Sequence, residues 1–149
     1  MEGTALLHYD LIHPPLLAAL AAAGHGSRIL LADGHFPCST HVNPAAAMIH
    51  LNLRPGLLDV DQVLEPLLDA VPIEHAAVMA SGGAPVPAHE GYRAALGAEV
   101  PFEEVERFAF YDLARTADTA VVVATGDRRQ YANLLLTVGV AGVTPRKDR

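Results

Sequence analysis

A histidine between two glycines is the first residue of this chain that could do chemistry. His25 stands in the triplet Gly24-His25-Gly26. Glycines on both sides leave the imidazole uncrowded and allow a ligand to approach the backbone closely. A histidine side chain, whose ordinary pKa is about 6.5, can both give and take a proton near neutral pH. We therefore treat His25 as a candidate acid–base residue, with an exposed loop histidine as the alternative.

Several other side chains could bind the hydroxyl groups of a small ligand. Asp33 follows an apolar run, and its carboxylate has two oxygens that could accept from two hydroxyls. The pair Asp33-Gly34 is equally typical of a turn, so both interpretations stay open. Further along, Arg107 supplies a rigid fork of donors, whereas Tyr131 and Asn133 can both donate and accept. The alternative is that these are a surface charge and ordinary core residues.

Metal, nucleotide and nucleophile chemistry lack their usual sequence patterns. The chain has eight histidines, but their spacing matches no zinc pattern. No glycine-rich phosphate loop is present, and the triplet around His25 precedes a predicted strand rather than a helix. Ser81-Gly82-Gly83 is not the nucleophile elbow of a serine hydrolase. We therefore expect proton transfer without a metal or cofactor. A metal site, the disfavoured alternative, would use His25, Asp33, His35, His41 and His50.

Charge and composition argue against several partners. The chain has 149 residues and a formal net charge of −7, which opposes binding to nucleic-acid phosphates. No apolar run reaches the roughly 18 residues that a membrane span requires, and the N-terminus lacks the pattern of a signal peptide. The single cysteine, Cys38, suits a reducing cytoplasm and predicts a small buried or half-buried side chain. We expect one soluble, cytoplasmic domain over residues 1–149, with no nucleic-acid or membrane partner.

Predicted strands alternate with predicted helices along the chain, which indicates a layered α/β domain with a mostly parallel sheet. Strands are predicted at 28–32, 48–53, 76–80, 105–108, 120–124 and 133–138, and helices at 15–23, after Asp59, at 89–96 and at 110–117. Asp59 with Gln62 is typical of a capping box, and Pro66 is expected to kink or shorten that helix. Gly24 is expected to end the first helix in the left-handed conformation. Ligands of such sheets bind beyond the carboxyl ends of the strands, here at Asp33-Gly34, Ser81-Gly82-Gly83 and Thr125-Gly126-Asp127.

Four motifs, taken together and in order, resemble one family. They are Gly24-His25-Gly26, Asp33-Gly34-His35-Phe36-Pro37, Arg107-Phe108-Ala109-Phe110-Tyr111 and Tyr131-Ala132-Asn133. Their order and approximate spacing resemble the D-ribose pyranase / L-fucose mutarotase family, from the first helix to about Val140. The third motif resembles the fucose mutarotase branch. Segments 45–56 and 81–90 depart from the family pattern, which leaves the identity of the sugar open.

This resemblance implies a fold, a reaction and a set of roles. The fold is a single three-layer domain in a homo-oligomeric ring, often a decamer, with sites near subunit boundaries. The reaction opens a sugar ring by removing the proton of the anomeric hydroxyl and protonating the ring oxygen, after which the ring closes on the other face. A positioned acid–base group, which typically contributes ~10²–10⁴-fold, is sufficient for it. His25 is the implied acid–base residue, and the implied sugar contacts are Asp33, Arg107, Tyr131, Ala132 and Asn133. Tyr131 or Asp33 would assist at the second oxygen, while Arg107 and Asn133 orient hydroxyls.

The predicted strand separates His25 from Asp33. With a rise of about 3.3 Å per residue, a straight strand would place them roughly 25 Å apart. Either the chain bends sharply, or the two residues of one site come from different subunits, and we favour the shared site. Two other functions stay open: a non-catalytic sugar-binding subunit linked to sugar uptake, which would not need His25, and a histidine-rich metal protein.

Overall fold

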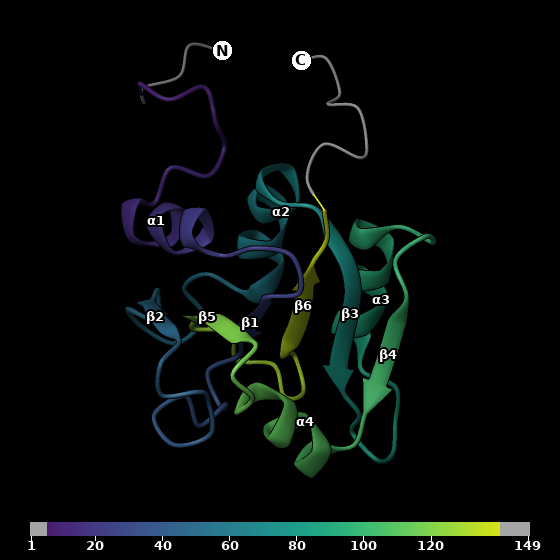
Figure 1. Ribbon diagram of the computed structural model, residues 1–149. Helices are drawn as coiled ribbons and strands as arrows, with labels where there is room; N and C mark the ends of the chain where they lie inside the picture. The colour runs from purple at the N-terminus through teal and green to yellow at the C-terminus, as the bar shows by residue number, and fades with distance from the viewer. Residues whose placement is uncertain (1–5, 141–149) are drawn as a thin grey trace.

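A mixed six-stranded sheet forms the centre of the molecule (Figure 1). The computed structural model describes residues 6–140, and within them the strands lie in the order β2-β5-β1-β6-β3-β4. The strands are β1 Arg28–Ala32, β2 Ala47–His50, β3 Ile73–Met79, β4 Phe102–Val105, β5 Thr119–Ala124 and β6 Leu134–Val138. β6 is antiparallel to β1 and β3, whereas the other neighbours pair in parallel. The prediction of a mostly parallel sheet is confirmed.

Helices cover both faces of this sheet and give three layers (Figure 1). They are α1 Pro14–Ala22, α2 Val60–Ala70, α3 Pro87–Leu96 and α4 Arg107–Ala114. The side chains of β1 alternate: Ile29 and Leu31 pack with α1, α2 and α3, whereas Leu30 and Ala32 pack with α4. A strand covered on both faces needs apolar residues at every position, which explains the continuous apolar run of β1. Within residues 6–140, no helix is long and apolar enough to cross a membrane.

The start of α2 is a capping box, as the sequence predicts. The Asp59 carboxylate accepts from the Gln62 backbone N–H at 2.9 Å, and the Gln62 side chain accepts from the Asp59 N–H at 3.0 Å. Pro66 does not shorten the helix, which continues to Ala70. The buried face of α2 explains this, because its packing outweighs the one hydrogen bond that proline removes. That face consists of Val60, Val63, Leu64 and Leu67.

The prediction that Gly24 ends the first helix in the left-handed conformation is wrong. Ala23 follows α1 in an extended conformation, and Gly26 is the glycine of the triplet with a positive φ, of 84°. The positive φ at Gly26 turns the chain into β1, so that the Gly26 N–H donates to the Val138 carbonyl oxygen at 2.9 Å. The triplet is therefore a strand entry rather than a helix cap.

The predicted strand at 105–108 and the helix at 110–117 are displaced in the structure. β4 ends at Val105, and α4 begins at Arg107. The cause is Glu106, whose carboxylate accepts from the backbone N–H groups of Phe108 and Ala109 at 3.0 and 3.1 Å. This cap satisfies donors that the first turn of a helix leaves without partners. Arg107 therefore lies on a helix rather than in a strand.

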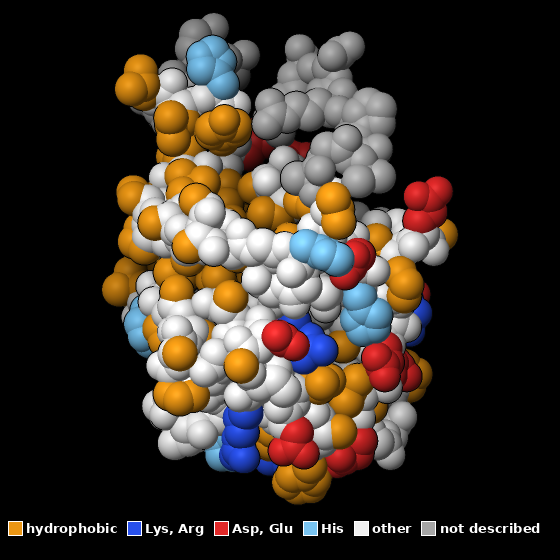
Figure 2. Space-filling view, in the orientation of Figure 1, with side chains coloured by type: hydrophobic (Ala, Val, Ile, Leu, Met, Phe, Trp, Pro, Cys, Tyr) orange, Lys and Arg blue, Asp and Glu red, His pale blue; other side chains and the backbone are white. Residues whose placement is uncertain are grey.

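Residues 6–12, called here the N-terminal segment, and α1 form an exposed apolar surface (Figure 2). Leu6, Tyr9 and Ile12 are 93%, 60% and 46% exposed. Every residue of α1 is apolar, yet only Leu16 and Leu20 are buried. Contiguous exposed apolar surface of this kind is typical of protein–protein contacts.

Candidate functional site

A cavity of about 220 Å³ opens at the edge of the sheet where the parallel strands end. β6 is antiparallel to β1, so the start of β6 meets the end of β1 at this edge. The sheet thereby brings Asp33 beside Asn133, although 100 positions separate them. The cavity is lined by Asp33, His35, Phe36, Met79, Arg107, Tyr111, Gln130, Tyr131 and Asn133.

Asp33 organises the turn at the end of β1 and the segment before β6. One carboxylate oxygen accepts from the N–H groups of His35 and Phe36 at 2.9 and 3.0 Å, and the other accepts from Ala132 at 3.1 Å. The Asn133 side-chain oxygen accepts from the Asp33 N–H at 2.8 Å. A carboxylate has about four acceptor positions. Asp33 therefore fills the turn role, and it retains an acceptor position for a ligand hydroxyl.

The environment of Asp33 is buried and sterically tight. Its side chain is only 3% exposed. Burial raises the pKa of Asp33, and the backbone N–H groups that it accepts from offset part of this increase. Gly34 is required beside it, because a Cβ at that position would lie 2.9 Å from the Asp127 carbonyl oxygen. The carboxylate is consequently held in one place before any ligand arrives.

The segment Tyr131-Ala132-Asn133 is strained and immobilised. Tyr131 has a φ of 58°, the left-handed conformation that costs a non-glycine residue about 1–2 kcal/mol. Asn133 is 3% exposed and Ala132 is fully buried. Ala132 does not line the cavity, and it contributes through the N–H that holds Asp33. Backbone strain of this kind is concentrated at functional sites in proteins.

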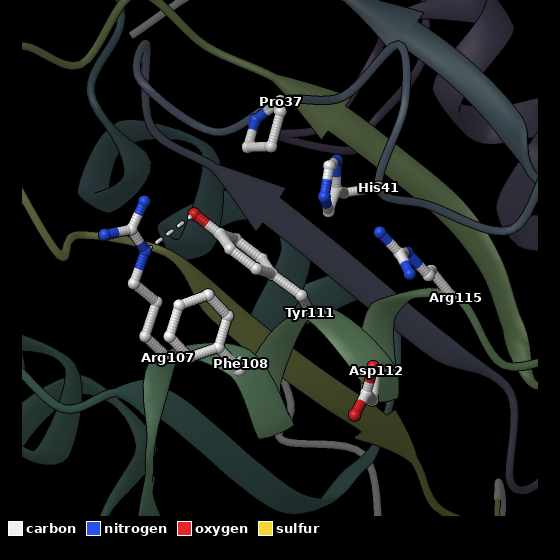
Figure 3. Close-up of a pocket in the computed structure, with 7 residues that line it drawn as sticks. All are labelled: Pro37, His41, Arg107, Phe108, Tyr111, Asp112 and Arg115. Atoms are coloured by element: carbon white, nitrogen blue, oxygen red, sulfur yellow. Dashed lines mark hydrogen bonds between the residues drawn. The ribbon is translucent and has the colours of Figure 1, made fainter.

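A second cavity of about 300 Å³ shares Arg107 and Tyr111 with the first. Figure 3 shows the residues that line this second cavity. The Tyr111 ring lies across this space, and its hydroxyl accepts from the Arg107 Nε–H at 3.2 Å. This hydrogen bond raises the pKa of the Arg107 guanidinium. Tyr111 packs edge-on against Phe36 and Phe108, with ring centroids 5.4 and 6.2 Å apart. Arg107 therefore lines both cavities, with Tyr111 orienting its guanidinium.

Asp127 and Arg129 support the loop that carries Tyr131. Asp127 is 2% exposed, and one of its oxygens accepts from Arg129 at 2.7 Å and from the Val60 N–H at 3.0 Å. Burial acts to raise the pKa of Asp127, but these hydrogen bonds and the charge of Arg129 outweigh burial and lower it. Arg129 also reaches Asp61 at 2.7 Å. The loop is therefore tied to the start of α2.

His25 lies at the opposite end of β1 from this cavity. It precedes β1, whereas Asp33 follows it, and the neighbouring Gly26 bonds to the end of β6. The His25 Nε2 is 3.1 Å from both carboxylate oxygens of Glu74. The two side chains are 59% and 45% exposed, and His25 lines neither of the two cavities described here.

Within one chain, the structure brings together most of the predicted site residues. They are Asp33, Arg107, Tyr131 and Asn133, with the Ala132 backbone beneath them. Sequence analysis missed Glu74, Met79 and Gln130. Glu74 gave little signal, because it lies outside the strand predicted at 76–80. In the structure β3 begins at Ile73 and includes Glu74. Its contact with His25 joins residues 49 positions apart and becomes visible only with the strand order.

The structure gives no support to the metal hypothesis. Among the described residues, no group of three or more His, Cys, Asp or Glu side chains could hold a metal ion. His35 contacts the Arg128 carbonyl oxygen at 2.9 Å, and His41 contacts the Thr40 hydroxyl at 2.7 Å. Cys38 is half-buried, as predicted, and burial raises its pKa to about 11. A thiol that stays protonated at neutral pH is a poor nucleophile.

Known proteins share this sequence pattern and this fold. Residues 7–141 match the RbsD / FucU transport protein family. Human fucose mutarotase is 35% identical over 91% of this chain and 93% of its own length. The D-ribose pyranase of Paracidovorax citrulli is 35% identical over 94% and 98%. The structure of the fucose mutarotase of Streptococcus pneumoniae in complex with L-fucose has a TM-score of 0.77 to this chain, with 26% identity over 91% and 99%.

These matches cover nearly all of the chain and of the relatives, and they include both ends of β1 and the segment before β6. Because the family match spans residues 7–141, it contains all four motifs that the sequence analysis singled out. The chain belongs to the RbsD / FucU transport protein family.

Proposed function

We propose that this protein is a sugar mutarotase, an isomerase that interconverts the anomers of a monosaccharide, L-fucose or a related aldose. The observation that carries the proposal is the 220 Å³ cavity whose wall combines a carboxylate, a guanidinium, a phenol and an amide. Such a wall offers both donors and acceptors to a ring of hydroxyl groups. Relatives named fucose mutarotase and D-ribose pyranase, and a relative with L-fucose bound, support the same class of substrate.

Ring opening requires two proton transfers and ring closure reverses them, so that only the configuration at C1 changes. A base removes the proton of the anomeric hydroxyl while an acid protonates the ring oxygen. The bond between C1 and the ring oxygen breaks and gives the open-chain aldehyde. Rotation about the C1–C2 bond and reversal of these steps produce the other anomer. In our proposal His25 performs one proton transfer, Tyr131 or Asp33 assists at the other oxygen, and Arg107 and Asn133 orient the hydroxyls. A positioned acid–base pair of this kind contributes about 10²–10⁴-fold.

The site would be complete only between subunits. His25 and Asp33 lie at opposite ends of β1, so one chain cannot present both to one sugar. An exposed apolar surface on α1 and the N-terminal segment provides area for subunit contacts. We therefore infer a homo-oligomer, a ring of the decameric kind, in which His25 of one subunit faces the cavity of its neighbour. A single, half-buried cysteine is compatible with the cytoplasm as its location.

The test of function is magnetisation transfer between anomer signals in NMR, over a panel of fucose, ribose, galactose and related aldoses. We expect exchange between the anomers of at least one sugar to accelerate in proportion to protein concentration. The alternative is a non-catalytic sugar-binding subunit linked to uptake, which the isolated cavity and exposed His25 would also allow. Sugar binding without faster exchange would establish that alternative.

The test of the shared site is complementation between two inactive variants. His25→Gln removes the acid–base group and Asp33→Asn alters the cavity, so each variant alone should be inactive. The two variants are mixed in equal amounts, unfolded together and refolded. If subunits assemble at random, about a quarter of the subunit boundaries combine an intact His25 from one subunit with an intact Asp33 from the other. Recovery of about a quarter of the wild-type activity is expected, with ring size measured by light scattering. A mixture as inactive as its components would show that each site belongs to one subunit.

A further inference from the structure

Two buried side chains of α3 hold the backbone of the segment that walls the cavity. His89 is 4% exposed, and its Nε2 lies 2.8 Å from the Tyr131 carbonyl oxygen. Tyr92 is fully buried, and its hydroxyl donates to the Ala132 carbonyl oxygen at 2.7 Å. The Ala132 N–H in turn donates to Asp33. Consecutive backbone groups of this segment are therefore bound from two sides, by α3 and by the carboxylate.

The direction of the His89 hydrogen bond is fixed by its partner. A carbonyl oxygen can only accept, so the His89 Nε2 carries the hydrogen and donates. The other ring nitrogen, Nδ1, lies 3.8 Å from a carboxylate oxygen of Glu104, which is half exposed. In the neutral ring, this hydrogen bond requires the tautomer with the hydrogen on Nε2.

The residue that His89 holds is the strained one. Tyr131 has the left-handed φ of 58°, which a residue with a Cβ keeps only when its surroundings enforce it. We propose that His89 is a positioning residue for the sugar site: its Nε2–H fixes the Tyr131 carbonyl, which keeps Tyr131 in the left-handed conformation and its side chain on the cavity wall. This inference rests on the proposed mutarotase function, in which Tyr131 assists proton transfer.

The test compares side chains that differ in their reach or in whether they carry a hydrogen-bond donor. Glutamine carries its amide nitrogen as many bonds from Cβ as the His89 Nε2, whereas asparagine is one bond shorter. Leucine has a similar size and no donor. We expect His89→Leu and His89→Asn to lower kcat about tenfold with little change in KM, because the phenol is misplaced. His89→Gln should restore most of kcat. Glu90→Gln, at the next and exposed position of α3, is the control and should match the wild type.

A double-mutant cycle shows whether His89 acts through the Tyr131 hydroxyl. Tyr131→Phe removes the hydroxyl and leaves the backbone bond to His89 in place. In that background, His89→Leu should cause no further loss of kcat, since the group that it misplaces is already absent. A full tenfold loss in both backgrounds would overturn the proposal, as would equal kcat values for the Leu, Asn and Gln variants.

Hydrogen exchange gives a measurement that does not depend on catalysis. The Ala132 amide is the next group along the chain and donates to Asp33. Its exchange should accelerate about tenfold or more in His89→Leu and His89→Asn, and not in His89→Gln. Unchanged protection in all three variants would contradict the positioning role even if the protein had no mutarotase activity. Failure of the proposed function alone would leave this protection pattern intact.

Discussion

The two ends of β1 hold their chemically active side chains in opposite ways. At the carboxyl end, Asp33 is 3% exposed and accepts hydrogen bonds from three backbone N–H groups. At the amino end, the His25 side chain is 59% exposed, and its ring contacts the Glu74 carboxylate at 3.1 Å. The carboxyl end therefore forms a cavity whose polar groups are held by hydrogen bonds within the chain, whereas the amino end exposes a single imidazole.

In the proposed mechanism, the two ends have different tasks that fit this difference. Ligand binding needs donors and acceptors in fixed places, and a buried hydrogen-bonded network supplies them. Proton transfer needs a group that can reach the reacting atoms, and an exposed histidine can be presented to another molecule. Mutations at the two ends should therefore fail differently: at the carboxyl end in folding and binding together, and at the amino end in catalysis alone.

The largest expected effect is that of Asp33→Ala. The substitution leaves the N–H groups of Phe36 and Ala132 buried without their acceptor, so the free energy of unfolding should fall by about 3 kcal/mol. Anomer exchange should fall to the uncatalysed rate. Urea denaturation and NMR exchange measure the two effects. The control is Asp59→Ala, which removes a helix cap away from the cavity and should cost about 1 kcal/mol with activity retained.

His25→Gln should separate catalysis from stability. Anomer exchange should fall by about 10²–10³-fold, because the acid–base group is lost. The free energy of unfolding should change by less than about 0.5 kcal/mol, since the side chain is exposed. Sugar binding, measured by calorimetry, should persist. Catalysis that survives undiminished would remove His25 from the mechanism and leave the carboxyl end as the whole site.

Sequence reasoning found the parts of the fold that depend on local patterns. The continuous apolar run of β1 and the capping box at Asp59 were read correctly, because packing and capping act between near neighbours. The start of α4 was missed, because Glu106 reads as an ordinary charged residue until its carboxylate is seen to accept from the following N–H groups. Pro66 does not end α2, because a tertiary packing face compensates for one lost hydrogen bond.

The site was predicted less completely than the fold, for a topological reason. Asp33, Arg107, Tyr131 and Asn133 came from residue type and from family resemblance, and the structure places them on one cavity. His89 and Glu74 act through contacts 42 and 49 positions away, respectively. Such contacts exist only because β6 is inserted between β1 and β3, and an antiparallel insertion in a mostly parallel sheet leaves no local mark in the sequence.

Asp127→Asn sharpens the comparison through pH. The folded pKa of Asp127 is below its ordinary value of 3.8, so its carboxylate stabilises the fold above about pH 4. This stabilisation is lost as the pH falls through the lowered folded pKa. At pH 7 the variant should lose about 2 kcal/mol, because Arg129 and the Val60 N–H lose a charged acceptor. The two proteins should begin to converge near pH 4 and should meet once the pH is below the lowered folded pKa.

Urea denaturation between pH 2 and pH 7 measures this convergence. Asp118→Asn, an exposed carboxylate, is the control and should follow the wild-type curve at every pH. A constant difference between Asp127→Asn and the wild type down to the lowest pH would mean that Asp127 stabilises by shape and not by charge.

The smallest expected effect is that of Glu74→Gln at the amino end. Exposed ion pairs contribute about 0–1 kcal/mol, so the variant should unfold within about 0.5 kcal/mol of the wild type. Activity should fall only severalfold, because the imidazole loses the carboxylate that orients it. Glu103→Gln is the matched control, since it breaks a similar exposed pair, His75–Glu103 at 3.3 Å, without touching His25. A loss of activity in Glu74→Gln alone would assign the effect to the orientation of His25. Equal losses of activity in both variants would show that the change in surface charge causes it. A small effect would separate the two ends further: at the exposed end the Glu74 carboxylate would only orient the proposed acid–base residue, whereas at the buried end Asp33 also supports the fold.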